Sequence, residues 1–446
     1  MNLNISSKKQ LKAESVFTSQ ELEDYFDRLY PICRSILGNG FRSSLEILRE
    51  LIPFECYDTP SGAQVLDWII PDEWDCRDAF IIKPDGEKLA DFKERNIRVV
   101  QYSTPVNASM SLEELKPHLH TLPDMVDHFP YVASYYKRQW GFCLTQKEYD
   151  ALEEGTYKVV IKSTIKPGFL RYGQTILKGK TDNEILLSTY LCHPQMANHE
   201  LSGPLAMAIL YRMLKASGPH KFSYRFVIIP ENIGSATLLH QHGDRLVEKV
   251  HAGFVLNCLG HGKKWTYKMS RRANSKSDLA ALNQLKFKQG DLDVIPFFPD
   301  GSDERQYCSP GFNLPIGLVM RYMYGQFPEY HTSADDKSLI SFETLLESAQ
   351  AYFDIMMTLE LDFTPQARIL RGTPMLSRSP ISLYRDTMNF RSHAKTESTR
   401  VMLEILNLAE GNLSLLEMAQ LKNFDLLLHS ELIEDLVKSG YIADQS

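Results

Sequence analysis

Between residues 157 and 361 the sequence alternates short apolar runs with amphipathic segments. The apolar runs have the length of strands and are Tyr157–Ile161, Glu184–Thr189, Tyr224–Ile229, Ala252–Leu256 and Ile316–Met320. The segments with helical periodicity are Gly203–Ala216, Ser235–His242, Asp278–Leu285 and Phe342–Leu359. Strands that alternate with helices along a chain pair mainly in parallel, and the helices cover the sheet. The sequence therefore predicts an α/β domain with a largely parallel sheet sandwiched by helices.

The rest of the 446-residue chain predicts additional parts, because a single core stops growing well below this length. Short apolar and aromatic runs after Pro53 alternate with Pro and Gly turns, which is typical of a β-rich module. Prolines then interrupt a Ser/Arg-rich stretch that begins near Thr364. The predicted parts are N-terminal helices of the α/β domain (1–54), a β-rich inserted domain (55–145), the α/β domain (146–363), a linker (364–397) and a C-terminal domain (398–446).

The predicted C-terminal domain has three amphipathic segments and a short final strand, an arrangement that resembles a winged helix. A DNA-reading winged helix needs a basic surface. From Gln366 to Ser446 the sequence has nine Lys and Arg residues against ten Asp and Glu residues. The third predicted helix has four acidic residues and one lysine, so phosphate would repel it. The charge therefore favours a protein contact or self-association over nucleic-acid binding.

Composition and local signals indicate a soluble cytoplasmic protein. The chain is 43% hydrophobic and 24% charged with a formal net charge of −7, which gives no reason to expect a polyanionic partner. No apolar run approaches the ~20 residues of a membrane span, and residues 1–14 lack the apolar core of a signal peptide. The seven cysteines form no C-x-x-C pair, so we expect reduced thiols and no thiolate zinc knuckle.

Four polar motifs follow or lie close to the ends of predicted strands. They are Leu187–Pro204, Pro230–Gly234, Gly301–Arg305 and Glu329–Asp335. Open α/β sheets place their chemistry at the carboxyl ends of the strands. Hydrolysis of an amide needs an activated water, which a metal on imidazoles provides, and a carboxylate that accepts its proton. His193, His199 and His331 are the candidate ligands and Glu231 is the candidate base, although a single histidine after a strand is commonly structural and Glu231 could cap a helix.

The order H…N-x-x-x-S-G…P-E-x-x-G…Y-H-T-x-x-D resembles the co-catalytic zinc aminopeptidases, the clan that includes bacterial leucyl aminopeptidase and glutaminyl cyclase. The whole chain is similar to a bacterial family that joins an aminopeptidase-like domain to a β-rich insertion and a C-terminal winged helix, and that is often associated with polysaccharide biosynthesis. The stretches that carry this second resemblance are Arg34–Gly38, Pro60–Gly62, Leu66–Trp68, Ser134–Tyr136, Trp140–Cys143 and Tyr190–Pro194. The resemblance implies a mixed, largely parallel sheet and a zinc-dependent hydrolase.

The chain keeps three of the clan's functional positions. His193 and His331 match ligand histidines, and Glu231 matches the general base. His199 stands where the clan has a metal-bridging aspartate, and Asn232 where it has a ligand glutamate. Another ligand aspartate aligns with an asparagine, residue 257. Because imidazole does not readily bridge two metals, we expect one zinc ion rather than two, bound by the three histidines.

Further candidates surround this set. Glu200 and Asp303 are reserve ligands for the metal. Asp303 and Arg305 also lie in a loop that would line the pocket, where Arg305 or Arg321 could grip a substrate carboxylate. The alternative for this loop is an ordinary surface segment with an internal ion pair. Arg271 and Arg272 are weaker candidates for the same grip.

Three functions remain open from the sequence. The first is a zinc hydrolase that acts on a small amide or peptide, including an amino-sugar derivative in polysaccharide biosynthesis. The second is a pseudo-enzyme or scaffold that has lost its metal site and binds partners through the C-terminal domain. The third is a winged-helix transcription regulator, which the acidic third helix disfavours.

Overall fold

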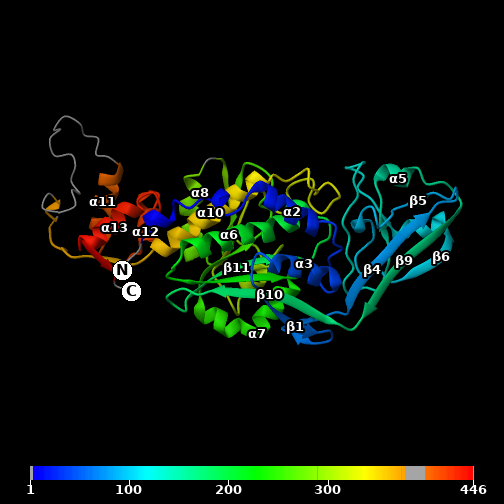
Figure 1. Ribbon diagram of the computed structural model, residues 1–446, viewed down its shortest axis with the longest axis horizontal. Helices are drawn as coiled ribbons and strands as arrows, with labels where there is room; N and C mark the ends of the chain where they lie inside the picture. Colours follow the sequence, from blue (N-terminus) through cyan, green and yellow to red (C-terminus); the bar gives the residue numbers. More distant parts are fainter. Residues whose placement is uncertain (1–3, 289, 373, 377–396, 445–446) are drawn as a thin grey trace.

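The computed structural model describes residues 4–288, 290–372, 374–376 and 397–444. Figure 1 shows three parts in a row, with an α/β body in the middle, a β-rich part at one end and a helical part at the other. The helix α1 (Ile5–Lys8) and the strand β18 (Ile442–Asp444) both lie near the helical end. Short 3₁₀ helices cover Ala13–Ser15, Asn96–Arg98 and Lys116–His118.

The body contains an eight-stranded sheet in the order β1-β10-β12-β11-β13-β16-β14-β15. The strands in that order are Glu55–Pro60, Phe169–Leu177, Ser223–Ile229, Glu184–Tyr190, Val250–Leu256, Ile316–Met320, Trp265–Lys268 and Leu292–Ile295. β12, β11, β13 and β16 are parallel neighbours, and so are β14 and β15. The pairs β1–β10, β10–β12 and β14–β16 are antiparallel. The predicted α/β fold with a mixed, largely parallel sheet is confirmed.

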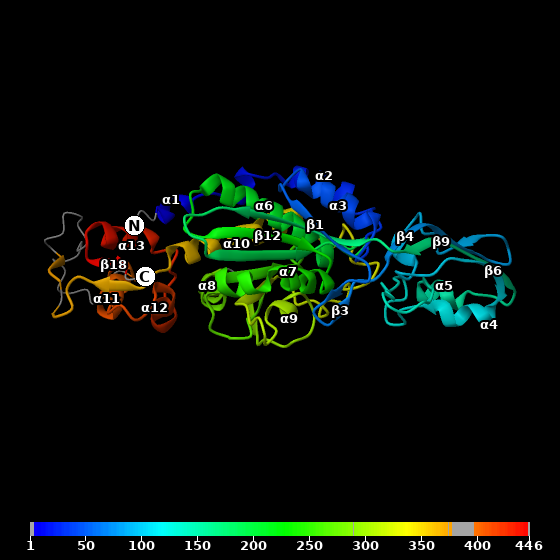
Figure 2. The same ribbon diagram turned by 90° about the horizontal axis from the view of Figure 1, so that it is seen from below.

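Helices cover both faces of this sheet because its strands are apolar on both sides. Ile185 and Leu187 of β11 point to one face of the sheet and belong to the apolar cluster on that face. Leu186 points to the other face and belongs to the second cluster. The helices on the first face are α2 (Ser19–Leu29), α3 (Asn39–Arg49), α6 (Ser202–Ser217), α8 (Lys276–Lys286) and α10 (Phe342–Leu361). On the other face lie α7 (Ile233–Lys249) and α9 (Glu304–Tyr307), and Figure 2 shows α6 and α7 on opposite sides of the sheet.

The β-rich part is built on a four-stranded antiparallel sheet in the order β5-β4-β9-β6. Its strands are Lys88–Leu89, Glu73–Ile82, Thr156–Lys166 and Val106–Ser111. Two small pairs accompany them, β2 (Gln64–Val65) with β3 (Trp68–Ile69) and β7 (Leu119–His120) with β8 (Phe142–Cys143). The short helices α4 (Leu112–Leu115) and α5 (Gln146–Asp150) lie in the same part.

Two strands pair differently from the sequence-based prediction. The run Tyr157–Ile161 was predicted for the α/β sheet, but it lies in β9 and pairs with β4 and β6. Conversely, β1 falls inside the predicted insertion (55–145) but forms the edge of the central sheet against β10. Both runs have strand character, and only partners distant in sequence decide which sheet each one joins. The domain boundaries remain a prediction, and the pairing favours an insertion that runs between β1 and β10.

The C-terminal part contains α11 (Glu397–Leu408), α12 (Leu415–Lys422) and α13 (Ser430–Lys438). The strand β17 (Pro365–Ala367) lies within the predicted linker 364–397 and pairs with β18. Residues 377–396 of that linker lie outside the described residues. Asn283 of α8 hydrogen-bonds the backbone of Phe424 and Leu426 at 2.9 and 3.1 Å, so this part packs directly on the body. The winged-helix assignment remains a prediction.

None of the helices in the described ranges is long and apolar enough to cross a membrane.

Candidate metal centre

The three predicted histidines come from two segments at one edge of the central sheet. His193 follows β11, and His199 lies six residues later in a π-helical turn (Ala197–Leu201) that leads into α6. His331 lies in the loop between β16 and α10. Glu231 follows β12, the parallel neighbour of β11, so the carboxyl ends of these two strands bring it beside His193.

The imidazoles of His193, His199 and His331 face one another. One ring nitrogen of each lies within 4.8 Å of one ring nitrogen of the other two. The ring centroid of His199 is 4.6 Å from those of both His193 and His331. This spacing is suited to one ion bound at the ~2.0–2.1 Å typical of a zinc–imidazole bond.

The backbone around the cluster adopts conformations that L-residues rarely take. His331, Asn232 and Gln195 have φ values of 55°, 60° and 43°. His199 lies in a π-helical turn, a rare form that is frequent at functional sites. Strained backbone persists only where the surrounding structure enforces it, and it concentrates at active sites.

Asp335 holds the turn that carries His199. Its Oδ1 accepts hydrogen bonds from the amides of Ala197 and Asn198 at 3.2 and 2.6 Å, and its Oδ2 accepts one from the amide of His199 at 2.9 Å. Asp335 is fully buried, and burial raises its pKa to about 7 despite these bonds. Asp335 ends the polar motif Glu329–Asp335 noted in the sequence, but no role was predicted for it.

Replacing Asp335 by asparagine is expected to lower the free energy of unfolding by roughly 1–3 kcal/mol. The amide nitrogen of asparagine would face a backbone N–H, so at least one buried donor would lose its acceptor. Urea denaturation of the metal-free protein measures the change. Asp85→Asn, in an exposed turn of the β-rich part, serves as the control. An unchanged midpoint for Asp335→Asn would show that the turn does not depend on this carboxylate.

Glu200 orients His193. Its Oε2 is 2.8 Å from Nδ1 of His193, and its Oε1 accepts a hydrogen bond from the His193 amide at 2.9 Å. Arg34, also fully buried, lies 4.0 Å from the same carboxylate and donates to the His193 carbonyl at 2.8 Å. A carboxylate bound to the far nitrogen of a histidine fixes the tautomer of a metal ligand. Glu200, predicted as a reserve ligand, is therefore placed to support His193 instead.

Glu200→Gln is expected to raise the dissociation constant for zinc roughly 10–100-fold, the usual cost of losing such support. Competition with a chromophoric chelator measures this constant. Glu94→Gln, in the β-rich part, is the control, and we expect wild-type affinity from it. A larger loss of zinc affinity from Glu200→Gln, comparable to that from removing a histidine, would instead make Glu200 a direct ligand. The ion would then be bound by a second, neighbouring group, which consists of Cys192, His193 and Glu200.

The protonation and hydrogen bonding of the histidines fit a metal. Both ring nitrogens of His199 and Nε2 of His331 are buried without a hydrogen-bond partner in the described part of the chain. Burial and the nearby His193 lower the pKa of His199 well below 6.5 and that of His331 to about 3, so both are neutral. Burial acts to lower the pKa of His193 as well, but Cys192 and Glu200 outweigh it and raise this pKa well above 6.5. Neutral imidazoles with unpartnered nitrogens are the form that binds zinc.

Glu231 lies on the open side of the cluster. Its Oε2 is 3.8 Å from Nε2 of His193, and its side chain is 18% exposed, against 4% for His193. Burial raises the pKa of Glu231 to about 7, while His193 opposes the shift. A carboxylate with a pKa near the working pH is suited to general-base catalysis.

The loop after β15 contacts the residue that follows Glu231. Asp303 accepts hydrogen bonds from the amide of Asn232 and from Ser235, both at 2.7 Å, and the guanidinium of Arg305 donates to Asn232 Oδ1 at 2.6 Å. Oδ2 of Asp303 is buried without a partner in the described ranges. Asp303 and Arg305 are thus brought next to the site, with Asp303 fully buried.

Arg321 does not lie beside the candidate metal centre. Its guanidinium donates to Ser348 and Glu347 of α10, both at 2.9 Å, and lies 3.8 Å from the ring centroid of Trp265. It therefore belongs to the packing between α10 and the sheet. The structure therefore does not support the predicted role of this residue in binding a substrate carboxylate. The sequence could not distinguish the two roles, because an arginine at a strand end looks the same in both.

Sequence reasoning missed the tyrosines that surround the imidazoles. The ring centroid of Tyr131, from the β-rich part, lies 5.3 Å from those of His193 and His331. Its amide donates to the His331 carbonyl at 2.8 Å. Tyr190 and Tyr330 lie 5.3 and 4.7 Å from His199. The stretch Ser134–Tyr136 was noted in the sequence, but nothing there indicated that the segment before it reaches the metal centre.

The central domain has an aminopeptidase-like fold. Two solved structures with this fold are the zinc aminopeptidase BSAP from Bacillus subtilis (12% identity, TM-score 0.54, covering 77% of this chain and 94% of that chain) and a peptidase M28 precursor from Shewanella amazonensis (13% identity, TM-score 0.55, covering 84% and 99%). At this identity the likeness concerns the fold alone.

The chain belongs to the family described as a domain of unknown function (DUF4910), whose model matches residues 23–362. It is 40% identical over 402 residues to a Clostridium acetobutylicum protein named for polysaccharide biosynthesis and an aminopeptidase-like domain, with 90% of this chain and 91% of that protein covered. A crystal structure of a C. acetobutylicum protein named as a peptidase has a TM-score of 0.88 at 36% identity, and covers 97% of each chain. The predicted resemblance is confirmed.

Proposed function

We propose that this protein is a zinc-dependent hydrolase of the aminopeptidase type that cleaves a small amide or peptide. The observation that carries the proposal is the cluster of three imidazoles beside the carboxylate of Glu231, in which both ring nitrogens of His199 and Nε2 of His331 are buried without a partner among the described residues. A buried polar atom without a partner costs free energy, so the retention of such nitrogens in His199 and His331 favours a bound ligand. The names of the relatives, a peptidase and an aminopeptidase-like protein, support the same class of reaction.

His193, His199 and His331 would hold one zinc ion and leave a fourth position open. Bound there, zinc acts as a Lewis acid that polarises the amide carbonyl and the attacking water. A second ion has less support, because Asn232 and Asn257 carry no charge where the clan has carboxylates.

Glu231 would take a proton from the attacking water and return it to the departing amine nitrogen. Its pKa of about 7 lets the carboxyl group both accept and donate a proton near neutral pH. Glu200 keeps His193 in one tautomer throughout, and Asp335 keeps His199 in place. Asp303 holds the amide of Asn232, the residue after Glu231, and so limits the positions that the base can take.

The substrate proposal follows from the relatives and from the site. The named role of the C. acetobutylicum relative in polysaccharide biosynthesis favours an amide of an amino sugar over a general peptide. Arg305 remains the proposed contact for a substrate carboxylate, since it lies beside the site through Asn232. The C-terminal part is proposed to make a protein contact, and the seven free cysteines support a reducing, cytoplasmic location.

Zinc titration of chelator-treated protein tests the proposal. We expect binding of about one ion per chain, and hydrolysis of aminoacyl amides only after zinc is restored. Calorimetry measures zinc binding, and the release of p-nitroaniline from aminoacyl p-nitroanilides measures hydrolysis. Failure to bind zinc would favour the scaffold, and a salt-dependent shift of DNA mobility would favour the regulator.

A further inference from the structure

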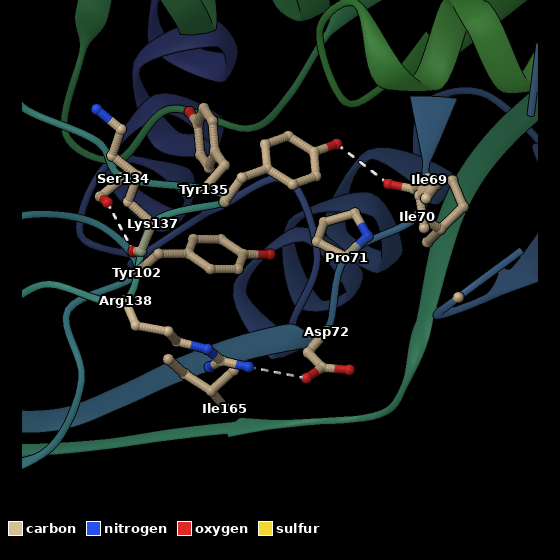
Figure 3. Close-up of a pocket in the computed structure, with 12 residues that line it drawn as sticks. Ile69, Ile70, Pro71, Asp72, Tyr102, Ser134, Tyr135, Lys137, Arg138 and Ile165 are labelled. Carbon is tan, nitrogen blue, oxygen red and sulfur yellow. Dashed lines mark hydrogen bonds and ion pairs between the residues drawn. The ribbon is translucent and has the colours of Figure 1, made fainter. Parts of the chain in front are cut away.

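A hollow of about 290 Å³ lies where the β-rich part meets the body. One wall runs from Ile69, the last residue of β3, to Asp72, and the other runs from Ser134 to Arg138, as Figure 3 shows. Tyr102 and Ile165 line the hollow between these walls. The volume is at the lower end of the range of small-molecule pockets, so it suits one ring of a ligand.

The walls present aromatic and apolar surface that is held rigidly. Tyr136 is 58% exposed and Ile69 is 59% exposed, and the Tyr136 hydroxyl donates to the Ile69 carbonyl at 3.1 Å across the hollow. The Tyr102 ring packs edge to face on Tyr135 with centroids 5.5 Å apart, and it stacks on Trp74 at 5.9 Å. Exposed rings that are fixed in place offer flat surface for a ligand at little cost in conformational entropy.

Polar groups lie beside these rings. Arg138 pairs with Asp72 at 3.2 Å, with side-chain exposures of 63% and 33% (Figure 3). Such an exposed pair contributes little to stability, so both partners can share their donors and acceptors with a ligand.

Two tyrosines connect the hollow to the metal centre. Tyr135 lines the hollow, and its hydroxyl is 3.1 Å from that of Tyr131. The Tyr131 ring in turn packs against His193 and His331, with centroids 5.3 Å apart in both cases. A group in the hollow is therefore separated from the candidate metal ligands by two aromatic rings.

We propose that this hollow is a subsite that binds a sugar ring, and that it holds the sugar portion of the amide substrate. The C–H face of a sugar packs on tyrosine rings while its hydroxyl groups bond with planar, charged side chains, and Tyr136, Arg138 and Asp72 provide both kinds of contact. The statement that the sugar belongs to a substrate rests on the proposed hydrolase activity. Binding of the sugar itself does not require catalysis.

An apolar amino-acid side chain is the competing occupant. It would cover Ile69 and Ile70, but it would also remove the half-exposed Arg138–Asp72 pair from water without bonding the donors and acceptors that the pair leaves free. Burying such groups without a partner costs free energy. The hydroxyl groups of a sugar can bond with them, so the observations favour a sugar.

The test measures binding and catalysis separately. Saturation-transfer NMR detects binding of methyl N-acetylglucosaminide to the full-length protein, with and without zinc. Hydrolysis is compared between leucyl-glucosamine and leucine p-nitroanilide, which share an amino acid and differ in the sugar. The variants are Tyr136→Ala and Arg138→Ala, with Val126→Ala and Arg77→Ala as matched exposed controls in the same part of the chain.

We expect the glycoside to bind with or without zinc, and each test variant to weaken it roughly tenfold. The preference for the sugar amide, as a ratio of kcat/KM values, should fall by a similar factor, and the controls should match the wild type. The subsite would be overturned if the wild-type protein did not bind the glycoside and if Tyr136→Ala and Arg138→Ala kept the wild-type ratio of kcat/KM values. Binding of phenylalanine amide in its place, dependent on Tyr136, would overturn it as well. Tyr136-dependent glycoside binding without any hydrolysis would support the sugar site and count against the hydrolase alone.

Discussion

Replacing Glu231 by glutamine is expected to lower kcat/KM for amide hydrolysis by about 10²–10⁴-fold and to leave zinc binding intact. Glutamine has the size of glutamate but cannot accept the proton of the attacking water. The carboxylate lies 3.8 Å from His193 Nε2 and is more exposed than the imidazole of His193, so we expect its loss to remove a base and no ligand. Steady-state kinetics and metal analysis of the same preparation measure the two effects.

Glu329→Gln is the matched control, since residue 329 lies two positions before His331 outside the cluster. We expect wild-type kinetics from it. Full activity in Glu231→Gln would mean that another group takes the proton and that Glu231 is not the general base. Loss of zinc together with activity would instead make Glu231 a ligand.

Replacing His331 by alanine is expected to abolish zinc binding and hydrolysis together. Two imidazoles would remain, and too few ligands are left to retain the ion against a chelator. The loss of affinity should exceed the 10–100-fold change expected from Glu200→Gln, because a ligand rather than its support is removed. Metal content after dialysis and calorimetric titration measure the effect.

His251→Ala, at a stacked imidazole on β13, serves as the control for a general loss of stability. His199→Ala then separates two ligand sets. Zinc retained in His199→Ala but lost in His193→Ala would point to the neighbouring group of Cys192, His193 and Glu200. Unchanged metal content in all three histidine variants would contradict the hydrolase and favour the scaffold.

The three histidines could be predicted from the sequence because each stands at or near the end of an apolar run or within a short motif. Parallel strands place their carboxyl ends at one edge, so His193 and Glu231 were expected together before any coordinates. His331 was a candidate because of its polar motif, but its loop lies between β16 and α10 and no local pattern shows where that loop folds.

Side-chain roles near the cluster could not be read in the same way. Glu200 was predicted as a reserve metal ligand and Arg321 as a grip for a substrate carboxylate, but Glu200 bonds with His193 whereas Arg321 packs on Trp265 and α10. The difference depends on side-chain direction, which follows from packing against residues far away in sequence.

The sequence by itself determined the class of fold and the candidate ligands, because hydrophobic periodicity and polar motifs are local properties of the chain. Only the tertiary structure decided that β1 joins the central sheet, that β9 joins the β-rich sheet, and that Tyr131 reaches the histidines. A strand carries its pattern of alternation but not the identity of its partner, since pairing is selected by the burial of surfaces that distant segments provide. For the same reason the hollow beside Tyr136 exists only in the folded protein.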